Sequence, residues 1–417
     1  MSAAGPLPRR SLPQPSDEGT PVGAAGPLPR RSLPQPSGEG TPAGAAGPLP
    51  RRSLPQPSGE GTPVSTLRQQ LSDCGRQVLL AMLVGTAGVG PVLAQVGPAA
   101  VVAGSPEAKP QEPGIAEWLL RMHEASRRRA YIGTFVVTSG STLSSARIWH
   151  VCDGEQQVQR VESLSGAPRS TFRRNDQVIT FFPASKTAVA ERRESLGQFP
   201  ELLKTTGSPI AQHYVARRIG SERVAGLDSD VVQILPRDDL RHGYRVWSEQ
   251  KSGLVVKLQT IDSEGRVLEQ AAFSELQLDA PVSMAKLSQM MDNTEGYRVE
   301  RPGLVKTTAA SEGWVLKSPV AGFVPMSSYK RSTASSEGAA ADQTMQWVFS
   351  DGLASVSLFV GPFDSRRHPQ EGSTSIGATN TLSRRIGDKS GEWWLTVVGE
   401  VPRSTLSAFA AGLERRK

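Results

Sequence analysis

The chain has 417 residues, of which 37% are hydrophobic, and its formal net charge is +7. Residues 1–94 hold eight Lys and Arg against five Asp and Glu, which leaves 39 basic and 35 acidic side chains in the remainder. This balance argues against a dedicated nucleic-acid-binding protein, in which basic residues are concentrated on one face. The part after Ala94 is long enough for two ordinary domains.

Three near-identical copies of a 21-residue repeat open the chain: Ala3–Gly23, Ala24–Gly44 and Ala45–Ser65. The copies are rich in Pro, Gly and Arg and contain hardly any bulky apolar residue, so they cannot bury a core. We therefore expect residues 1–66 to form a disordered leader. An array of Pro-rich ligands in polyproline II conformation would have the same composition, so that interpretation stays open.

Residues 67–94 have the pattern of a secretory signal peptide. Arg68 and Arg76 precede an apolar stretch, Val78–Leu93, which is short and interrupted by glycines, and the small residue Ala94 follows it. This pattern predicts cleavage near Ala94 and export of an unanchored chain. Residues 95–113 then form a Pro/Gly/Ala linker.

A signal peptide normally begins near the start of a chain, yet no Met lies between Met1 and Met82. Translation from a non-Met codon near Val64 or Leu67, or a tolerated leader, would reconcile the two observations. After cleavage Cys152 is the single cysteine, so the exported chain has no intramolecular disulfide and depends on its apolar core.

The first expected element is an amphipathic helix, because Ile115, Trp118, Leu119 and Met122 follow helical spacing. It ends near three consecutive basic residues, Arg127, Arg128 and Arg129. Basic side chains in the last turn stabilise the helix dipole. They are also candidates for binding a lipid phosphate.

An alternation of apolar and polar residues from Tyr131 to Leu278 predicts a long run of strands separated by turn residues. The expected strands are Tyr131–Thr138, Ala146–Cys152, Gln156–Val161, Ser170–Arg174, Val178–Phe182, Lys186–Glu191, Tyr214–Ser221, Asp230–Pro236, Gly243–Glu249, Leu254–Asp262 and Val267–Leu278, with a helix around Phe199–Leu203 and another from Pro281. Such an order implies an antiparallel α+β domain over residues 114–291. If its few helices cover the sheet incompletely, an apolar groove remains.

Residues 292–311 are polar and contain Gly and Pro, so we place the interdomain linker there. Residues 312–417 are expected to form a second, smaller α+β domain. Its expected elements are strands at Trp314–Leu316, Met345–Phe349, Leu353–Val360 and Trp393–Val398 and a terminal helix from Pro402.

Motifs of catalysis are scarce. The sequence has no HExxH, GxSxG, Walker loop or CxxC, and none of the three SxxK matches is followed by KTG. His242, beside Arg241 near a hairpin, is interpreted as an exposed loop residue. We therefore expect no catalytic residue, metal ligand or cofactor, and an exported hydrolase is kept only as a rival hypothesis.

Aromatic residues gather in the second domain. Trp314, Phe323 and Met326 lie around one turn, and Asp351 and Gly352 form another. In the pair Trp393-Trp394, successive strand side chains point to opposite faces, so one of them should leave the core. Exposed aromatics favour a partner-binding surface formed by the five residues of the two turns. Burial in the core is the alternative.

Five sequence blocks, in this order, carry a resemblance to a known family: Tyr244-Arg245-Val246-Trp247, Ser263–Gln270, Gly322-Phe323, Phe349–Leu353 and Val398–Pro402. Over about residues 115–413 the chain resembles the MucB/RseB family of periplasmic negative regulators of the envelope-stress sigma factor. The repeat in residues 1–65 has no counterpart in that pattern.

The resemblance implies a large N-terminal domain similar to the lipoprotein carrier LolA, a curved antiparallel sheet covered by helices. It implies a smaller C-terminal domain that binds the periplasmic part of a membrane-bound anti-sigma factor of the RseA or MucA type. Binding would shield this partner from the first stress protease, and lipid or lipopolysaccharide would release it. A periplasmic carrier of lipid or lipoprotein is the alternative, and a homo-oligomer stays open.

Overall fold

The computed structural model describes residues 114–154, 156–192, 210–333, 342–368, 370–388 and 391–416. The predicted repeat leader, signal peptide and linker within residues 1–113, and the helix expected around Phe199–Leu203, lie outside the described residues. Within the described ranges, no helix combines the length and the apolar character that crossing a bilayer requires.

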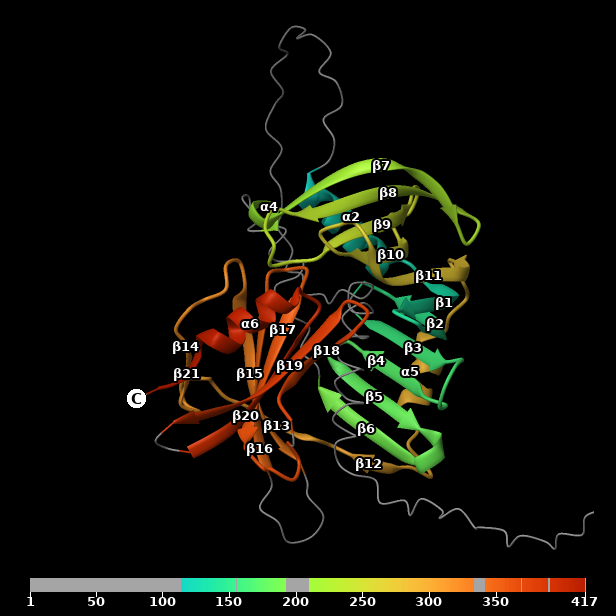
Figure 1. The fold of residues 1–417 in the computed structure, drawn as a ribbon. Coiled ribbons are helices and arrows are strands. Elements are labelled where there is room, and N and C mark those ends of the chain that lie inside the picture. Colours follow the sequence, from blue (N-terminus) through green and yellow to red (C-terminus); the bar gives the residue numbers. More distant parts are fainter. Residues whose placement is uncertain are drawn as a thin grey trace, which may run out of the picture. The chain divides into compact units, whose positions relative to one another are not determined.

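Four α-helices and one short 3-10 helix are described, and strands dominate the fold (Figure 1). The helices are α2 (Ile115–Arg128), α4 (Ile210–His213), α5 (Met284–Asp292) and α6 (Arg403–Gly412), with η1 (Pro183–Ser185) as the 3-10 helix. The strands up to residue 300 are β1 (Tyr131–Ser139), β2 (Thr142–Cys152), β3 (Gln157–Ser163), β4 (Ser170–Arg174), β5 (Gln177–Phe182), β6 (Thr187–Arg192), β7 (Tyr214–Val224), β8 (Leu227–Pro236), β9 (Gly243–Glu249), β10 (Val255–Ile261), β11 (Val267–Leu278) and β12 (Arg298–Glu300). The later strands are β13 (Gly303–Lys306), β14 (Trp314–Leu316), β15 (Val324–Thr333), β16 (Asp342–Ser350), β17 (Ser355–Pro362), β18 (Gly372–Ile376), β19 (Thr379–Asp388), β20 (Gly391–Gly399) and β21 (Leu413–Arg415).

The larger sheet contains twelve strands in the order β12-β6-β5-β4-β3-β2-β1-β11-β10-β9-β8-β7. Its neighbours are antiparallel, apart from the parallel pair β12 and β6. Most neighbours follow each other in sequence, because short turns join them as hairpins. The exceptions are β12 with β6 and β1 with β11. In the second pair Tyr131 faces Leu278, and this pairing joins the two halves of the domain.

Helix α2 covers part of this sheet with the apolar face that its sequence spacing predicts. Ile115, Trp118, Leu119 and Met122 are all buried in one cluster with residues of β7, β8, β9 and β10. Helix α5 lies against β3 and β4, and its Met291 is buried in a separate cluster with Phe172 and Phe181. Burial of these apolar faces is the main stabilising contribution of both helices.

The smaller sheet has seven strands in the order β13-β15-β16-β17-β20-β19-β18, and β14 pairs with β21 in a separate two-stranded sheet. Helix α6 packs on β19 and β20. Its Leu406 and Phe409 are buried in a core with Phe349, Val356 and further side chains of the sheet. The predicted α+β class, with a large antiparallel sheet and a smaller C-terminal domain, is confirmed.

Two parts of the C-terminal half differ from the sequence prediction. The segment 292–311, expected as a linker, contains β12, which extends the larger sheet beside β6, and β13, which extends the smaller sheet beside β15. Strands β18 and β19 were not predicted. Their Gly, Ser, Thr and Arg residues show little apolar alternation, and the pairing of β19 with β20 stabilises them instead.

Candidate functional site

The aromatic side chains predicted to bind a partner lie mostly in the core of the smaller domain. Trp314 and Phe323 are 4% and 6% exposed. Phe323 packs edge-on against Phe409, with ring centroids 5.5 Å apart, and Trp314 does the same against Trp393. Met326 is half-buried. Trp314 and Phe323 thus occupy the core positions that the sequence analysis weighed against a partner surface, because α6 and β20 cover them, while their contact with a partner stays an untested prediction.

The second predicted turn is a rigid connection. Asp351 Oδ1 accepts the backbone N–H groups of Leu353 and Ala354 at 2.9 and 2.7 Å. Gly352 has φ +99°, a conformation that side chains with a Cβ rarely adopt. The turn therefore fixes the direction of the Asp351 carboxylate, whose side chain is fully buried.

Asp351 contacts residues of the larger-sheet domain. Its Oδ2 accepts the Tyr214 hydroxyl at 2.9 Å and the Arg241 Nε–H at 2.6 Å, and the Arg241 side chain is fully buried too. We call Tyr214, Arg241 and Asp351 the junction cluster. Burial, with the Asp351 charge added, raises the pKa of Tyr214 well above its ordinary value, so its hydroxyl stays a donor.

Further contacts surround the junction cluster. Arg241 Nη2 donates to the Ala321 carbonyl at 2.5 Å, and its guanidinium lies 4.9 Å from the centre of the Phe323 ring. Leu353 packs in the apolar cluster of α2. Thr405 donates to the Leu240 carbonyl at 2.8 Å. A buried charge pair with satisfied hydrogen bonds thus links the two domains. Arg241 also pairs with Asp238, so loss of Arg241 would leave the buried Asp351 uncompensated, whereas loss of Asp351 would leave Arg241 with one partner.

A buried acidic group lies near the same junction. Glu400 is 4% exposed, and burial, with the charge of Glu269 added, raises the pKa of Glu400 to about 8. Glu269 Oε2 accepts the Ser139 hydroxyl at 3.0 Å. A Cβ at Gly377 would lie 2.1 Å from Ser139 Oγ and 2.6 Å from Glu269 Oε2, so the β18–β19 turn contacts β1 and β11 directly.

The basic residues at the end of α2 are engaged in ion pairs. Arg128 pairs with Glu124 at 3.4 Å, and Arg129 pairs with Asp279 at 2.8 Å. The side chain of Arg127 lies outside the described structure. Lipid binding by these three residues stays a prediction.

The face of the larger sheet under α2 is filled by side chains. Tyr214, Ile234 and Tyr244 are at most 2% exposed beneath the helix. The apolar groove expected from incomplete coverage is therefore closed here by α2 and Leu353. An acyl chain would need to displace the helix to reach this face.

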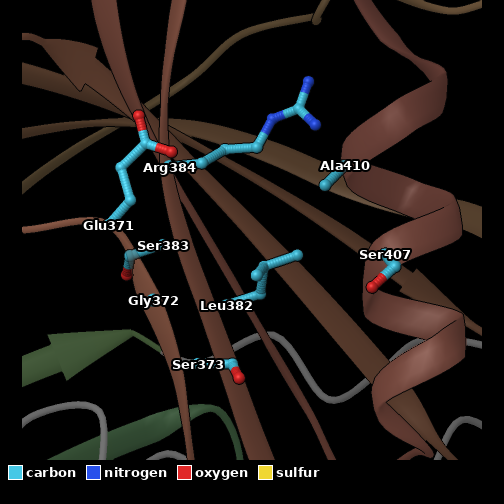
Figure 2. Close-up of a pocket in the computed structure, with 8 residues that line it drawn as sticks. All are labelled: Glu371, Gly372, Ser373, Leu382, Ser383, Arg384, Ser407 and Ala410. Atoms are coloured by element: carbon cyan, nitrogen blue, oxygen red, sulfur yellow. The ribbon is translucent and has the colours of Figure 1, made fainter.

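A pocket opens in the smaller domain, between the edge of its sheet and α6 (Figure 2). Its volume is about 440 Å³, and it is lined by Glu371, Gly372, Ser373, Leu382, Ser383, Arg384, Ser407 and Ala410. The sequence pattern did not indicate these residues, because they share no motif and come from three separate elements.

The histidines give no sign of catalysis or metal binding. His242 is 6% exposed, so its expected exposure in a loop is wrong, and burial lowers its pKa to about 4. In the part of the chain that the structure describes, no group of three or more His, Cys, Asp or Glu side chains could hold a metal ion.

These features define a class: a two-domain α+β protein in which a large antiparallel sheet and a smaller sheet domain are linked by a buried ion pair. The model of the MucB/RseB N-terminal domain matches residues 114–291, and the model of the MucB/RseB C-terminal domain matches residues 308–414. The chain belongs to the MucB/RseB family.

Curated relatives are regulators of sigma factors. The chain is 27% identical over 304 residues to the sigma factor AlgU regulatory protein MucB of Pseudomonas aeruginosa, which covers 73% of this chain and 92% of the relative. It is 25% identical over 300 residues to the sigma-E factor regulatory protein RseB of Haemophilus influenzae, with 72% and 90% covered.

Two solved structures of complexes are similar as well. A crystal structure of MucB in complex with MucA(peri) has a TM-score of 0.55 and 25% identity, and the similarity covers 72% of this chain and 99% of that one. The complex of Pseudomonas aeruginosa MucA/MucB has a TM-score of 0.56 and 25% identity, with the same coverage.

Proposed function

We propose that this protein is a non-enzymatic periplasmic regulator that binds the periplasmic part of a membrane-bound anti-sigma factor of the MucA or RseA type. Binding shields that partner from regulated proteolysis, and lipid or lipopolysaccharide releases it. The observation that carries the proposal is the family membership, which extends over both domains, together with the similar MucB that was crystallised with MucA.

The junction cluster offers a physical basis for regulation. Because Arg241 and Asp351 are buried on opposite sides of the junction, an intermediate separation would leave the Asp351 carboxylate without its cation, whereas Arg241 would keep its ion pair with Asp238. This favours two discrete arrangements of the domains over a continuous range. If the partner binds one arrangement and lipid the other, each ligand lowers the affinity for the other by the same factor.

The lipid step follows from the packing of α2. Acyl chains would replace the apolar face of α2 on the larger sheet, and Arg127, Arg128 and Arg129 at its end would meet a phosphate. The ion pairs of Arg128 and Arg129 do not oppose this step strongly, because pairs between exposed side chains stabilise a protein little.

The alternative is a carrier of lipid or lipoprotein. Both hypotheses require acyl chains to displace α2 from the larger sheet, so the filled face does not separate them. The carrier hypothesis, however, gives no role to the smaller domain. Retention of function after deletion of the residues beyond Asp292 would favour it.

Limited proteolysis tests the proposal. The purified full chain is mixed with the periplasmic domain of the anti-sigma factor from the same organism, and degradation of that domain by its stress protease is followed over time. We expect co-purification and slower degradation, and we expect added lipopolysaccharide to abolish both. Degradation at the same rate with and without the full chain would contradict the proposal.

A further inference from the structure

The outer strands of the two large sheets differ in how they are protected. Three of the four outer strands, β7, β12 and β13, contain charged residues. These are Arg217, Arg218, Glu222 and Arg223 in β7, Arg298 and Glu300 in β12, and Lys306 in β13. The fourth outer strand, β18, reads Gly-Ser-Thr-Ser-Ile, without charge or proline, and all five residues are exposed. Native proteins normally block such an edge, because its free backbone groups pair with another strand.

The turn between β18 and β19 determines which backbone groups of β18 point away from β19. Ile376 and Thr379 flank a two-residue turn that begins at Gly377, φ +58°. In such a hairpin the flanking pair is hydrogen-bonded and the pairs then alternate. The backbone N–H and C=O groups of Ser373 and Ser375 therefore point away from β19, toward the open edge.

The pocket described above lies along this edge and contains an unused cation (Figure 2). The side chain of Arg384 has no hydrogen bond or ion pair with any residue of the described structure, and its Nε atom is buried without an acceptor. Its guanidinium extends toward α6, whereas Glu371 accepts the backbone N–H of Arg385 at 3.1 Å. Such an unsatisfied buried donor is costly unless a ligand supplies an acceptor.

The rest of the pocket suits a peptide. Ser373, Ser383 and Ser407 add hydroxyl groups, and Leu382 and Ala410 add an apolar surface. Arg403 of α6 donates to Ser375 Oγ at 3.1 and 2.8 Å, which holds the edge strand in place beside the helix. A strand with free backbone groups and a neighbouring pocket for one side chain is the arrangement of β-augmentation.

We propose that β18 binds an extended acidic peptide segment as an additional strand of the smaller sheet, with one Asp or Glu side chain of that segment paired to Arg384. The identity of this segment rests on the proposed function, which makes it a part of the anti-sigma factor. The Arg384 guanidinium, which extends away from Glu371 toward α6, selects the carboxylate. The backbone of β18 binds the peptide backbone, whatever its sequence.

Peptide binding to the full chain tests this proposal. The probes are fluorescent decapeptides that tile the periplasmic domain of the anti-sigma factor, the same peptides with Asn and Gln in place of Asp and Glu, and an unrelated acidic decapeptide. Arg384→Gln should weaken binding of the acidic peptides roughly tenfold or more, since a charge-assisted hydrogen bond is lost. Arg385→Gln is the matched control, because Arg385 pairs with Glu392 and does not line the pocket.

Two variants at Ser373 test whether the β18 backbone contributes to peptide binding. Ser373→Pro removes an outward N–H and the hydroxyl, whereas Ser373→Ala removes the hydroxyl alone and keeps this N–H, so Ser373→Pro should weaken binding clearly more than Ser373→Ala does. The amide versions of the peptides should bind as weakly to the unchanged chain as the acidic versions bind to Arg384→Gln.

The outcomes separate this inference from the proposed function. If partner peptides bind and Arg384→Gln binds them equally well, the inference is overturned while the proposed function stands. If only the unrelated acidic peptide binds, and through Arg384, the site is supported and the partner is wrong. If inorganic phosphate binds at Arg384 but no peptide does, the pocket is an anion site and the inference is overturned.

Discussion

At the scale of single residues, the junction cluster dominates the energetics. Arg241 and Asp351 are fully buried, and the Tyr214 hydroxyl and two backbone N–H groups saturate the carboxylate. The ion pair itself contributes little to the free energy of unfolding. Breaking it is costly, because the Asp351 carboxylate would then be buried without a cation.

Substitution of one partner should therefore be severe. Arg241→Met is expected to lower the free energy of unfolding by about 3 kcal/mol, because the Asp351 carboxylate would stay buried without its cation. Urea denaturation followed by tryptophan fluorescence measures the change. Arg298→Met, which removes an exposed ion pair with Glu300, is the control and should leave the midpoint unchanged. Equal midpoints for both variants would contradict this role of the junction cluster.

A second residue-scale prediction concerns pH. In the folded chain the pKa of Glu400 is about 8, against an ordinary value of 4.5, so the folded state binds more protons than the unfolded state between these values. The free energy of unfolding should therefore fall as the pH rises toward 8. Burial lowers the pKa of His150 and His242 to about 4, which changes stability in the opposite direction, but only below about 6.5.

Between pH 6.5 and 8, the effect of Glu400 on the free energy of unfolding is thus separated from that of the two histidines. Urea midpoints measured across it should decrease for the unchanged chain and stay level for Glu400→Gln, which keeps a neutral side chain of the same shape. The variant should also be the more stable protein at pH 8. A slope that persists in Glu400→Gln would show that another group titrates.

At the scale of elements, the β18–β19 hairpin contributes both to the contact between the domains and to the proposed binding site. Its turn contacts Ser139 and Glu269 of the larger-sheet domain, and its outer strand forms the proposed peptide site. One hairpin thus lies between a domain contact and a binding edge. Any movement of this domain contact would shift the binding edge as well.

Gly377→Ala tests the turn contact. Gly377 and Gly140 both have φ +58°, but a Cβ at Gly140 meets nothing within 4 Å, whereas at Gly377 it meets Ser139 and Glu269. Both substitutions should cost about 1 kcal/mol of backbone strain. Only Gly377→Ala should cost clearly more, measured by thermal unfolding of the two variants side by side. Equal losses would mean that the turn does not contact the larger-sheet domain.

The elements also show how far the sequence predicts the fold. The bounds of β4, β9, β11 and β14 agree with the predicted strands, because alternating apolar residues and clear turn residues define them. β18 lacks this signal, since its residues are small and polar and its conformation depends on pairing with β19. The two strands form a hairpin through a two-residue turn, but no apolar alternation marks β18 in the sequence.

The candidate site was less predictable than the fold. Asp351 and Gly352 were singled out as an exposed turn, yet the turn is buried against Arg241, which lies far away in the sequence. Phe323 was taken as exposed for the same reason, and the Arg241 guanidinium covers its ring. Arg384 was not noticed, because an unpaired cation becomes visible only when its surroundings are known.

At the scale of the whole molecule, we propose a regulator whose two ligands compete, because each ligand favours a different arrangement of the two domains. The junction cluster favours discrete arrangements, the face under α2 is closed until the helix moves, and the smaller domain offers a free edge to a partner. Each of these features alone affects only the stability of the fold. Together they would couple the proposed lipid binding in one domain to partner binding in the other.

The most direct test is the dissociation constant of the full chain for the periplasmic domain of its anti-sigma factor, measured by calorimetry at increasing lipopolysaccharide concentration. The account predicts tight binding without lipopolysaccharide and a dissociation constant that rises until lipopolysaccharide saturates the chain. The affinity for lipopolysaccharide should fall by the same factor when the partner is bound. A dissociation constant that stays the same at saturating lipopolysaccharide would contradict the account.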